Sequence, residues 1–369
     1  MIANTWIDLK ALIAEESEKI DKLVLKEKEI ILFGAGFYGS MIVDYFNNRG
    51  YKVRYFCDND VKKQGKDING IYCLAPEELQ NHRDAIVFIS ARHKVQVVLS
   101  QLEKLGIESI VFDKYLVRVE IDNIDKIYNN YLEDQESKMV YFELIKAMYY
   151  GEKASIAKIF TENQYFCLPE FIKNNTEEIF LDCGAYVGNT TERFIWSRGD
   201  GLFRKIYAFE PGEKQFLALK QRSERLKKEW ALNEQQIECV NAAVGVKSAR
   251  ESYLLYDTQL SATRIIEKDD QENSKLVEIC SIDDFFSKDG GYEDVSFIKM
   301  DVEGSELDVI EGGKNLIEIK KPKLAVCVYH RPTDIIDIPI YIKKLVPQYK
   351  IALRHHSHIL SETVLYCWI

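Results

Sequence analysis

The sequence lacks long apolar runs, clustered cysteines and an excess of basic residues, and each absence excludes a class of protein. No stretch approaches the roughly 20 apolar residues that a membrane-spanning helix needs. The first ten residues contain no basic segment, apolar core or small-residue cleavage site, so no signal peptide is expected. The formal net charge of −10 argues against nucleic acid and anionic membrane surfaces as main partners. The eight scattered cysteines form no Cys-x-x-Cys pair, which favours reduced core thiols in a cytoplasmic protein.

The chain is long enough for two or more domains: it has 369 residues, of which 46% are hydrophobic. Strand patterns alternate with helical patterns in two separate stretches, which indicates two α/β domains with parallel sheets. The predicted divisions are an amphipathic helix at 1–28, a Rossmann-like nucleotide-binding-type domain at 29–115, a helical connector at 116–176 and a second α/β domain at 177–369. Within these divisions we expect connector helices at 125–150 and 153–161, and an inserted hairpin over the site within 250–281.

The most informative segment is IFLDCGAYVGNTT, which starts at Ile179. It predicts a buried strand ending at Asp182, then a turn with Gly184 and Gly188, and then a helix. Glycines let a ligand approach the backbone closely. The next strand, KIYAFE, ends at Glu210, whose carboxylate can accept hydrogen bonds from ribose hydroxyls. The turn lacks the Gly-x-Gly-x-x-Gly spacing of a pyrophosphate site, so it favours an adenosine ligand without a phosphate bridge, commonly S-adenosylmethionine (SAM).

Five motifs follow in order: LDCGAYVGNTT at 181–191, AFEP at 208–211, VNAAVG at 240–245, SIDD at 281–284 and IKMDVEGSEL at 298–307. Through them the chain from about residue 160 onward resembles the FkbM family of SAM-dependent O-methyltransferases. The resemblance implies a seven-stranded SAM-methyltransferase sheet with an antiparallel last strand. It also implies a site for SAM, for which the matching residues are Asp182, Gly184, Ala185, Gly188, Asn189, Glu210, Asn241 and Ala242.

Two of these acids also have structural interpretations. Glu210 precedes Pro211 and would otherwise be a solvated loop acid, and Asp182 would otherwise cap the following helix. Under the functional interpretation, Asp182 lies near the amino-acid part of SAM and Glu210 binds its ribose.

The candidate catalytic residues are Asp301, Glu303, His330 and His355, which follow or end predicted strands. Methyl transfer to a hydroxyl requires alignment, exclusion of water and removal of a proton. A histidine with an ordinary pKa near 6.5 suits proton removal at neutral pH, and Asp301 and His330 are the preferred pair. The alternative is that the histidines after residue 350 decorate a surface hairpin. The four side chains could also hold a divalent metal, but spacing cannot verify ligands from separate strands, so an obligatory metal is not favoured.

The N-terminal segment contains GAGFYG between a strand and a helix, so Gly34, Gly36 and Gly39 match Gly-x-Gly-x-x-Gly, and Asp58 ends the next strand. It resembles small Rossmann-like domains of sugar-modifying enzymes, which implies a site for a nucleotide-sugar. The alternative is a degenerate fold used for packing or for a homo-oligomer.

The sequence as a whole predicts a SAM-dependent O-methyltransferase that acts on a sugar hydroxyl of a nucleotide-linked sugar, a surface glycan or a glycosylated metabolite. Two alternatives remain open. One is a bifunctional sugar-processing enzyme with an NAD-type N-terminal domain, although that domain lacks a Tyr-x-x-x-Lys pair at a useful distance. The other is a non-catalytic adaptor that binds SAM or a nucleotide.

Overall fold

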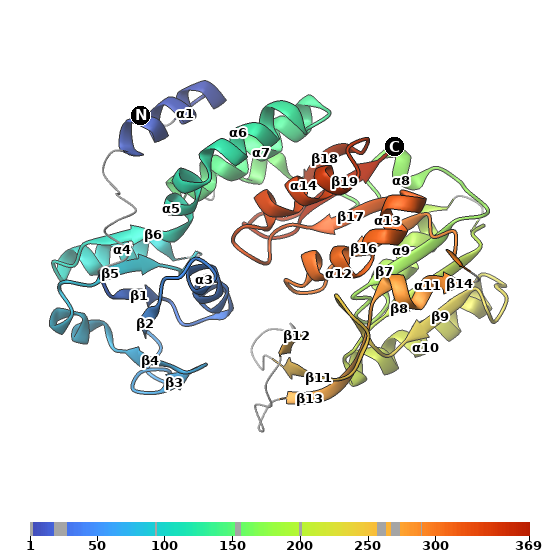
Figure 1. Ribbon diagram of the computed structural model, residues 1–369, viewed down its shortest axis with the longest axis horizontal. Coiled ribbons are helices and arrows are strands. Elements are labelled where there is room, and N and C mark those ends of the chain that lie inside the picture. The colour runs from blue at the N-terminus through green and yellow to red at the C-terminus, as the bar shows by residue number, and fades with distance from the viewer. Residues whose placement is uncertain are drawn as a thin grey trace.

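The computed structural model describes residues 3–17, 28–92, 94–151, 156–198, 201–256, 263–266, 274–288 and 290–369. Two α/β domains lie beside each other, and a group of helices joins them along one side (Figure 1). This confirms the predicted fold class of two Rossmann-like domains. One cluster of buried apolar side chains runs through both domains and the joining helices, from Trp6 and Phe46 through Ile145 to Met300 and Leu353. The three parts therefore share a core.

The N-terminal domain is a six-stranded sheet. Its strands, in spatial order, are β3 (Asp67–Ile68), β4 (Ile71–Leu74), β2 (Val53–Cys57), β1 (Ile30–Phe33), β5 (Ile86–Ile89) and β6 (Ser109–Val111). All neighbours are parallel except β3 and β4. Its helices are α3 (Phe37–Asn47), the 3₁₀ turn η1 (Pro76–Asn81) and α4 (Val95–Lys104). The predicted order of strands and helices is confirmed, with the β3–β4 hairpin in addition.

The connector differs from the prediction at several points. Its elements are α1 (Trp6–Ser17), α5 (Phe112–Val119), α6 (Ile121–Asn130), α7 (Gln135–Tyr150) and the 3₁₀ turn η2 (Ile156–Ile159). The single helix expected at 125–150 is wrong, because Asp134 caps a new helix by accepting from Ser137 N at 2.7 Å. The expected N-terminal helix is described only as far as Ser17, and residues 18–27 lie outside the described residues, as do 152–155 of the second expected connector helix.

The connector packs against both ends of the chain. The Trp6 ring stacks on Tyr128 with centroids 4.5 Å apart, which holds α1 against α6. On the other side, Leu353 N donates to Ser137 Oγ at 2.9 Å, and Leu132 forms a parallel bridge with Ile351. Helix α7 therefore covers part of the C-terminal domain and is no free linker.

The C-terminal domain is built on a seven-stranded sheet. Its strands, in spatial order, are β18 (Lys350–His355), β19 (Thr363–Trp368), β17 (Lys323–Cys327), β16 (Phe297–Met300), β7 (Ile179–Cys183), β8 (Lys205–Phe209) and β9 (Ile237–Val240). Only the last strand, β19, runs antiparallel to its neighbours, as predicted. The helices are α8 (Pro169–Ile172), α9 (Asn189–Ser197), α10 (Glu213–Glu229), α11 (Ile282–Phe286), α12 (Glu306–Gly312), α13 (Lys314–Lys320) and α14 (Asp334–Leu345).

Two small sheets complete this domain. One has the order β10 (Ala243–Val244), β13 (Ser274–Cys280), β11 (Ala249–Tyr256) and β12 (Thr263–Ile266); the other pairs β14 (Ser287–Lys288) with β15 (Gly291–Tyr292). Strands β11 and β13 are antiparallel, as expected for an insertion. The side chains of residues 249–275 lie outside the described part, so their place over the site stays a prediction. Among the described helices, none has the length and apolar character of a membrane span.

Candidate active site

A pocket opens at the carboxyl ends of β7, β8 and β16, where open α/β sheets usually bind ligands. Its lining includes Gly184, Asn189, Glu210, Ala242, Lys299, Asp301 and Glu303. The structure therefore brings together six of the predicted C-terminal site residues, and adds Lys299.

The glycine turn after β7 fits tightly against the neighbouring loop. Gly184 has φ +78°, and a Cβ there would lie 1.9 Å from the carbonyl oxygen of Asp301. Gly188 has φ +82° and directly precedes α9. Both positions adopt the left-handed backbone that favours glycine, and the close approach joins the turn to the loop after β16. The predicted turn is therefore also the contact between the two halves of the pocket.

Glu210 fastens this turn. Its carboxylate accepts from Tyr186 N at 2.9 Å and from Gly212 N at 2.8 Å, and the residue is only 5% exposed. The alternative of a solvated loop acid is therefore wrong. Burial raises the pKa of Glu210 to about 7, although the two N–H donors oppose the shift. Asn241 lies behind it and donates to the Glu210 carbonyl oxygen at 2.9 Å.

Asp182 lies beneath the pocket and does not line it. It is fully buried; its Oδ1 lies 3.1 Å from Lys299 Nζ, and its Oδ2 accepts from Thr191 Oγ1 at 3.0 Å. The cap of α9 is Gly188, so Asp182 is no helix cap. Lys299 also donates to the Gly184 carbonyl oxygen at 2.7 Å. The pair therefore supports the turn from below. Ala185 is likewise buried, at 1% exposed.

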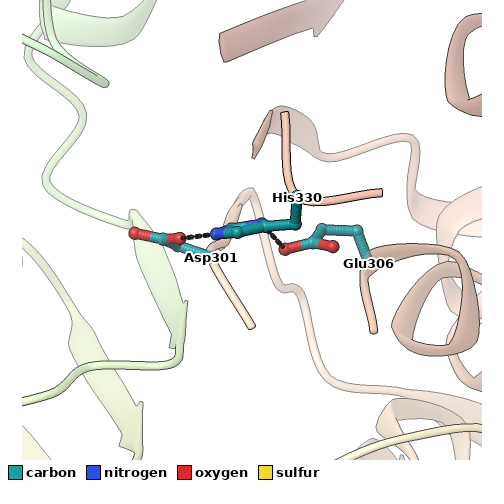
Figure 2. A group of neighbouring side chains, drawn as sticks. All are labelled: Asp301, Glu306 and His330. Carbon is teal, nitrogen blue, oxygen red and sulfur yellow. Dashed lines mark hydrogen bonds and ion pairs between the residues drawn. The ribbon is translucent and has the colours of Figure 1, made fainter. Parts of the chain in front are cut away.

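On the other side of the pocket, carboxylates surround His330. Its Nδ1 lies 2.8 Å from Glu306 Oε1, while Nε2 lies 3.5 Å from Asp301 Oδ1 and 3.4 Å from Glu303 Oε2. Figure 2 shows the ring between Asp301 and Glu306. Tyr165 donates to Asp301 Oδ2 at 2.9 Å. Three carboxyl groups thus surround one imidazole, and a phenol holds one of them, that of Asp301.

This environment changes the charge expected of His330. Burial favours the neutral ring, but Glu306 and then Asp301 and Glu303 outweigh it and raise the pKa to about 10. The expectation of an ordinary histidine pKa is therefore wrong, because the surrounding carboxylates favour the protonated ring. Burial raises the pKa of Glu303 to about 7. Burial also acts to raise the pKa of Asp301, but the charges of Lys299 and His330 outweigh it and lower that pKa.

The structure does not bring His355 to the pocket. It is buried at the end of β18, where its Nδ1 lies 2.8 Å from Thr363 Oγ1, and burial lowers its pKa to about 4. It does belong to the β18–β19 hairpin, but it is fully buried and so does not decorate a surface.

The pocket residues that were not predicted from the sequence include Gln164, Tyr165, Tyr329 and Glu362. Gln164 Nε2 donates to Glu362 Oε2 at 2.8 Å, and Tyr329 OH donates to Glu362 Oε1 at 3.1 Å. Tyr165 and Glu362 have φ values of +69° and +58°, which non-glycine residues adopt rarely and often at functional sites. These residues form a polar wall beside Asp301.

The N-terminal glycine turn repeats the arrangement of the C-terminal one. Asp58 Oδ2 accepts from Ala35 N at 2.8 Å and lies 3.3 Å from Lys63 Nζ. A Cβ at Gly39 would lie 2.1 Å from the Gly34 carbonyl oxygen, whereas one at Gly36 would meet nothing within 4 Å. Gly39 therefore serves packing, and Gly36 leaves space beside the turn.

Comparison with known proteins agrees with this geometry. Residues 182–359 match the family model described as the methyltransferase FkbM domain. A crystal structure of methyltransferase FkbM from Methylobacillus flagellatus KT aligns over 98% of this chain and 99% of its own, at 20% identity and a TM-score of 0.59.

Two other structures align more weakly. A putative methyltransferase from Streptococcus mutans in complex with SAH has 13% identity, with 52% and 89% of the two chains covered and a TM-score of 0.32. A UDP-D-quinovosamine 4-dehydrogenase from Vibrio fischeri has 22% identity, 24% and 83% coverage, and a TM-score of 0.20. None of the curated proteins matches the chain. The match over residues 182–359 identifies a methyltransferase FkbM domain within the C-terminal domain of this chain.

Proposed function

We propose that this methyltransferase uses SAM to methylate a hydroxyl group of a sugar. The observation that carries the proposal is the pocket itself, which has a glycine turn with a buried acid on one side and a polar, carboxylate-rich wall on the other. The first half suits an adenosine ligand and the second suits an acceptor with several hydroxyl groups.

Glu210 is suited to hold the ribose of SAM. Each of its carboxylate oxygens accepts one backbone N–H and keeps a further lone pair for a ligand hydroxyl. Asn189 and Ala242, which flank the turn and the end of β9, complete this half of the pocket. The residues present therefore fit the cofactor.

Bound SAM would supply an electrophilic methyl group: the carbon–sulfur bond would break with its electron pair staying on sulfur, as the acceptor oxygen forms the new carbon–oxygen bond. The chain must orient the acceptor hydroxyl and take up its proton. Asp301 and Glu303 face the pocket and are placed to accept that proton, while the charge of His330 stays close to both. Tyr165 fixes the Asp301 carboxylate through its hydroxyl.

The polar wall supports a sugar acceptor. Gln164 and Glu362 are donor and acceptor groups fixed by each other, and Tyr329 and Tyr186 add aromatic surface. Sugars present hydroxyl groups at their edges and C–H groups on their faces, so side chains of both kinds suit them.

We further propose that the turn at Gly34, Gly36 and Gly39 binds the nucleotide part of a sugar ligand. The space beside Gly36 and the following helix α3 support this, because a helix N-terminus presents free N–H groups to a phosphate. Gly36→Val would fill this space.

The test combines binding and product analysis on the full chain. Calorimetry should show SAM binding that is weakened about tenfold or more in Glu210→Gln, because a hydrogen bond involving a charge is worth roughly 1.5–3 kcal/mol. Asp58→Asn, the corresponding acid of the other domain, is the matched control and should bind SAM normally. Mass spectrometry should then detect methylation in a panel of nucleotide-sugars incubated with SAM. Equal SAM affinity of folded Glu210→Gln and the wild type would contradict the assignment of the pocket.

A further inference from the structure

The side chains around His330 form a cluster of possible metal ligands. Asp301, Glu306 and His330 each offer a ligand atom, and these atoms lie within 4.8 Å of one another. Glu306 is fully buried, and its Oε1 accepts from Val302 N at 3.0 Å as well as facing His330 Nδ1 at 2.8 Å. A carboxylate accepts only, so the His330 Nδ1 atom carries a proton and the ring orientation is fixed.

The other ring nitrogen is then directed at two carboxylates. The His330 side chain is 4% exposed, and Nε2 lies 3.5 Å from Asp301 Oδ1 and 3.4 Å from Glu303 Oε2. Both separations exceed the approximately 2.7–3.2 Å of ordinary N–H···O hydrogen bonds. They equal the spacing between neighbouring ligands of a metal bound tetrahedrally at about 2.1 Å.

Charge also favours a cation here. Lys299 is already paired with Asp182 at 3.1 Å, which leaves the carboxylates of Asp301, Glu303 and Glu306 around His330. The cluster therefore places three carboxyl groups around one imidazole ring. A divalent cation that replaces the Nε2 proton would add one further positive charge.

We propose that His330 Nε2, Asp301 and Glu303 bind a divalent cation, with Glu306 as the outer carboxylate that orients the histidine. A carboxylate hydrogen-bonded to the far nitrogen of a metal-binding histidine is a common arrangement in metal sites. Two carboxylates and one imidazole suit a cation that accepts both oxygen and nitrogen, such as Mn²⁺ or Zn²⁺. If the proposed methyl transfer holds, this cation would bind the acceptor hydroxyl and ease the loss of its proton, which the Glu303 oxygen not bound to the cation would take up.

The test measures metal binding alone, so its outcome does not depend on methyl transfer. Full-length protein, first treated with a chelator, is titrated with Mn²⁺ and followed by electron paramagnetic resonance, and bound Mn²⁺ is then displaced with Zn²⁺. We expect one saturable site per chain. Glu303→Gln should weaken it at least tenfold, and Glu306→Gln about 10–100-fold, the usual effect of losing an outer partner.

Glu318→Gln, which changes an exposed carboxylate outside the cluster, is the matched control and should bind Mn²⁺ as the wild type does. Glu303 is partly exposed at 37%, so its substitution does not threaten the fold, and circular dichroism verifies this. Two results would overturn the proposal. One is the lack of a saturable site in the wild type for either metal, and the other is equal Mn²⁺ affinity of Glu303→Gln and the wild type.

Discussion

Asp182 and Lys299 form the buried ion pair beneath the pocket, and breaking it tests how the sheet supports the site. Both side chains are at most 1% exposed. Lys299→Met keeps a long unbranched side chain but leaves the Asp182 carboxylate with the Thr191 hydroxyl as its hydrogen-bond donor. Removing one partner of a buried pair costs about 3–5 kcal/mol, because the remaining charge is uncompensated. We expect the free energy of unfolding of the C-terminal domain to fall by this amount.

A double-mutant cycle separates the charge effect from lost packing. In the Lys299→Met background, Asp182→Asn removes the uncompensated charge and keeps a side chain that can bond Thr191. The double variant should therefore be more stable than Lys299→Met alone, with a coupling energy of about 1–3 kcal/mol. SAM should bind weakly to Lys299→Met, because the Gly184 carbonyl oxygen loses its donor.

Urea unfolding followed by tryptophan fluorescence suits the measurement, since Trp196, Trp230 and Trp368 all belong to the C-terminal domain. Arg198→Met is the control: it breaks the buried pair with Glu178, 2.7 Å apart at the opposite end of β7, and should destabilise the domain without changing SAM affinity. Strictly additive effects of the two substitutions in the cycle, or a loss below about 1 kcal/mol in Lys299→Met, would refute this account.

Three further predictions concern single positions. The pKa of Glu210 is raised from 4.5 to about 7, so its contribution to stability is complete below pH 4.5 and is lost as pH rises through 7. The affinity for SAM should change in the opposite direction, because the ionised carboxylate is the form that accepts from the ribose. Calorimetry should show a rise in affinity of up to about tenfold from pH 6 to 8, and no change in Glu210→Gln. Gly39→Ala should lower the melting temperature, because its Cβ would lie 2.1 Å from a carbonyl oxygen, whereas Gly36→Ala should be tolerated. Tyr165→Phe frees the Asp301 carboxylate and should reduce turnover while SAM affinity stays within a few-fold.

The strands that position the pocket could be predicted because each is a short apolar run followed by a turn or an acid. The β3–β4 hairpin was missed although Asn69 and Gly70 form its turn, with φ values of +54° and +81°. Asn-Gly is a strong hairpin signal. Its flanking strands are too short to show an alternation of apolar and polar residues, so only the turn residues could have predicted the hairpin.

The site residues could be predicted where they lie within one of the five sequence motifs. Lys299 could have been found as well: it is the charged residue of an apolar strand, and it pairs in register with Asp182 of the neighbouring strand. Tyr165 and Glu362 could not, because they reach the pocket through tertiary packing and left-handed backbone that no local pattern marks.

Deleting residues 1–150 to test the N-terminal domain would also remove α7 from β18, so point substitutions such as Gly36→Val are the cleaner probe.

The two domains share one structural contact, between an acid and a glycine turn, but its surroundings differ. In each, the acid after the second strand accepts a backbone N–H of the preceding glycine turn: Asp58 from Ala35 and Glu210 from Tyr186. An acid at this position therefore has a structural reason to be present whether or not a ligand binds. What distinguishes Glu210 is its surroundings. Asp58 is paired with Lys63, whereas Glu210 lies in a pocket whose far wall is built from β16, β17 and the connector. The strand, turn and acid identify the fold, and only the residues across the pocket identify a site.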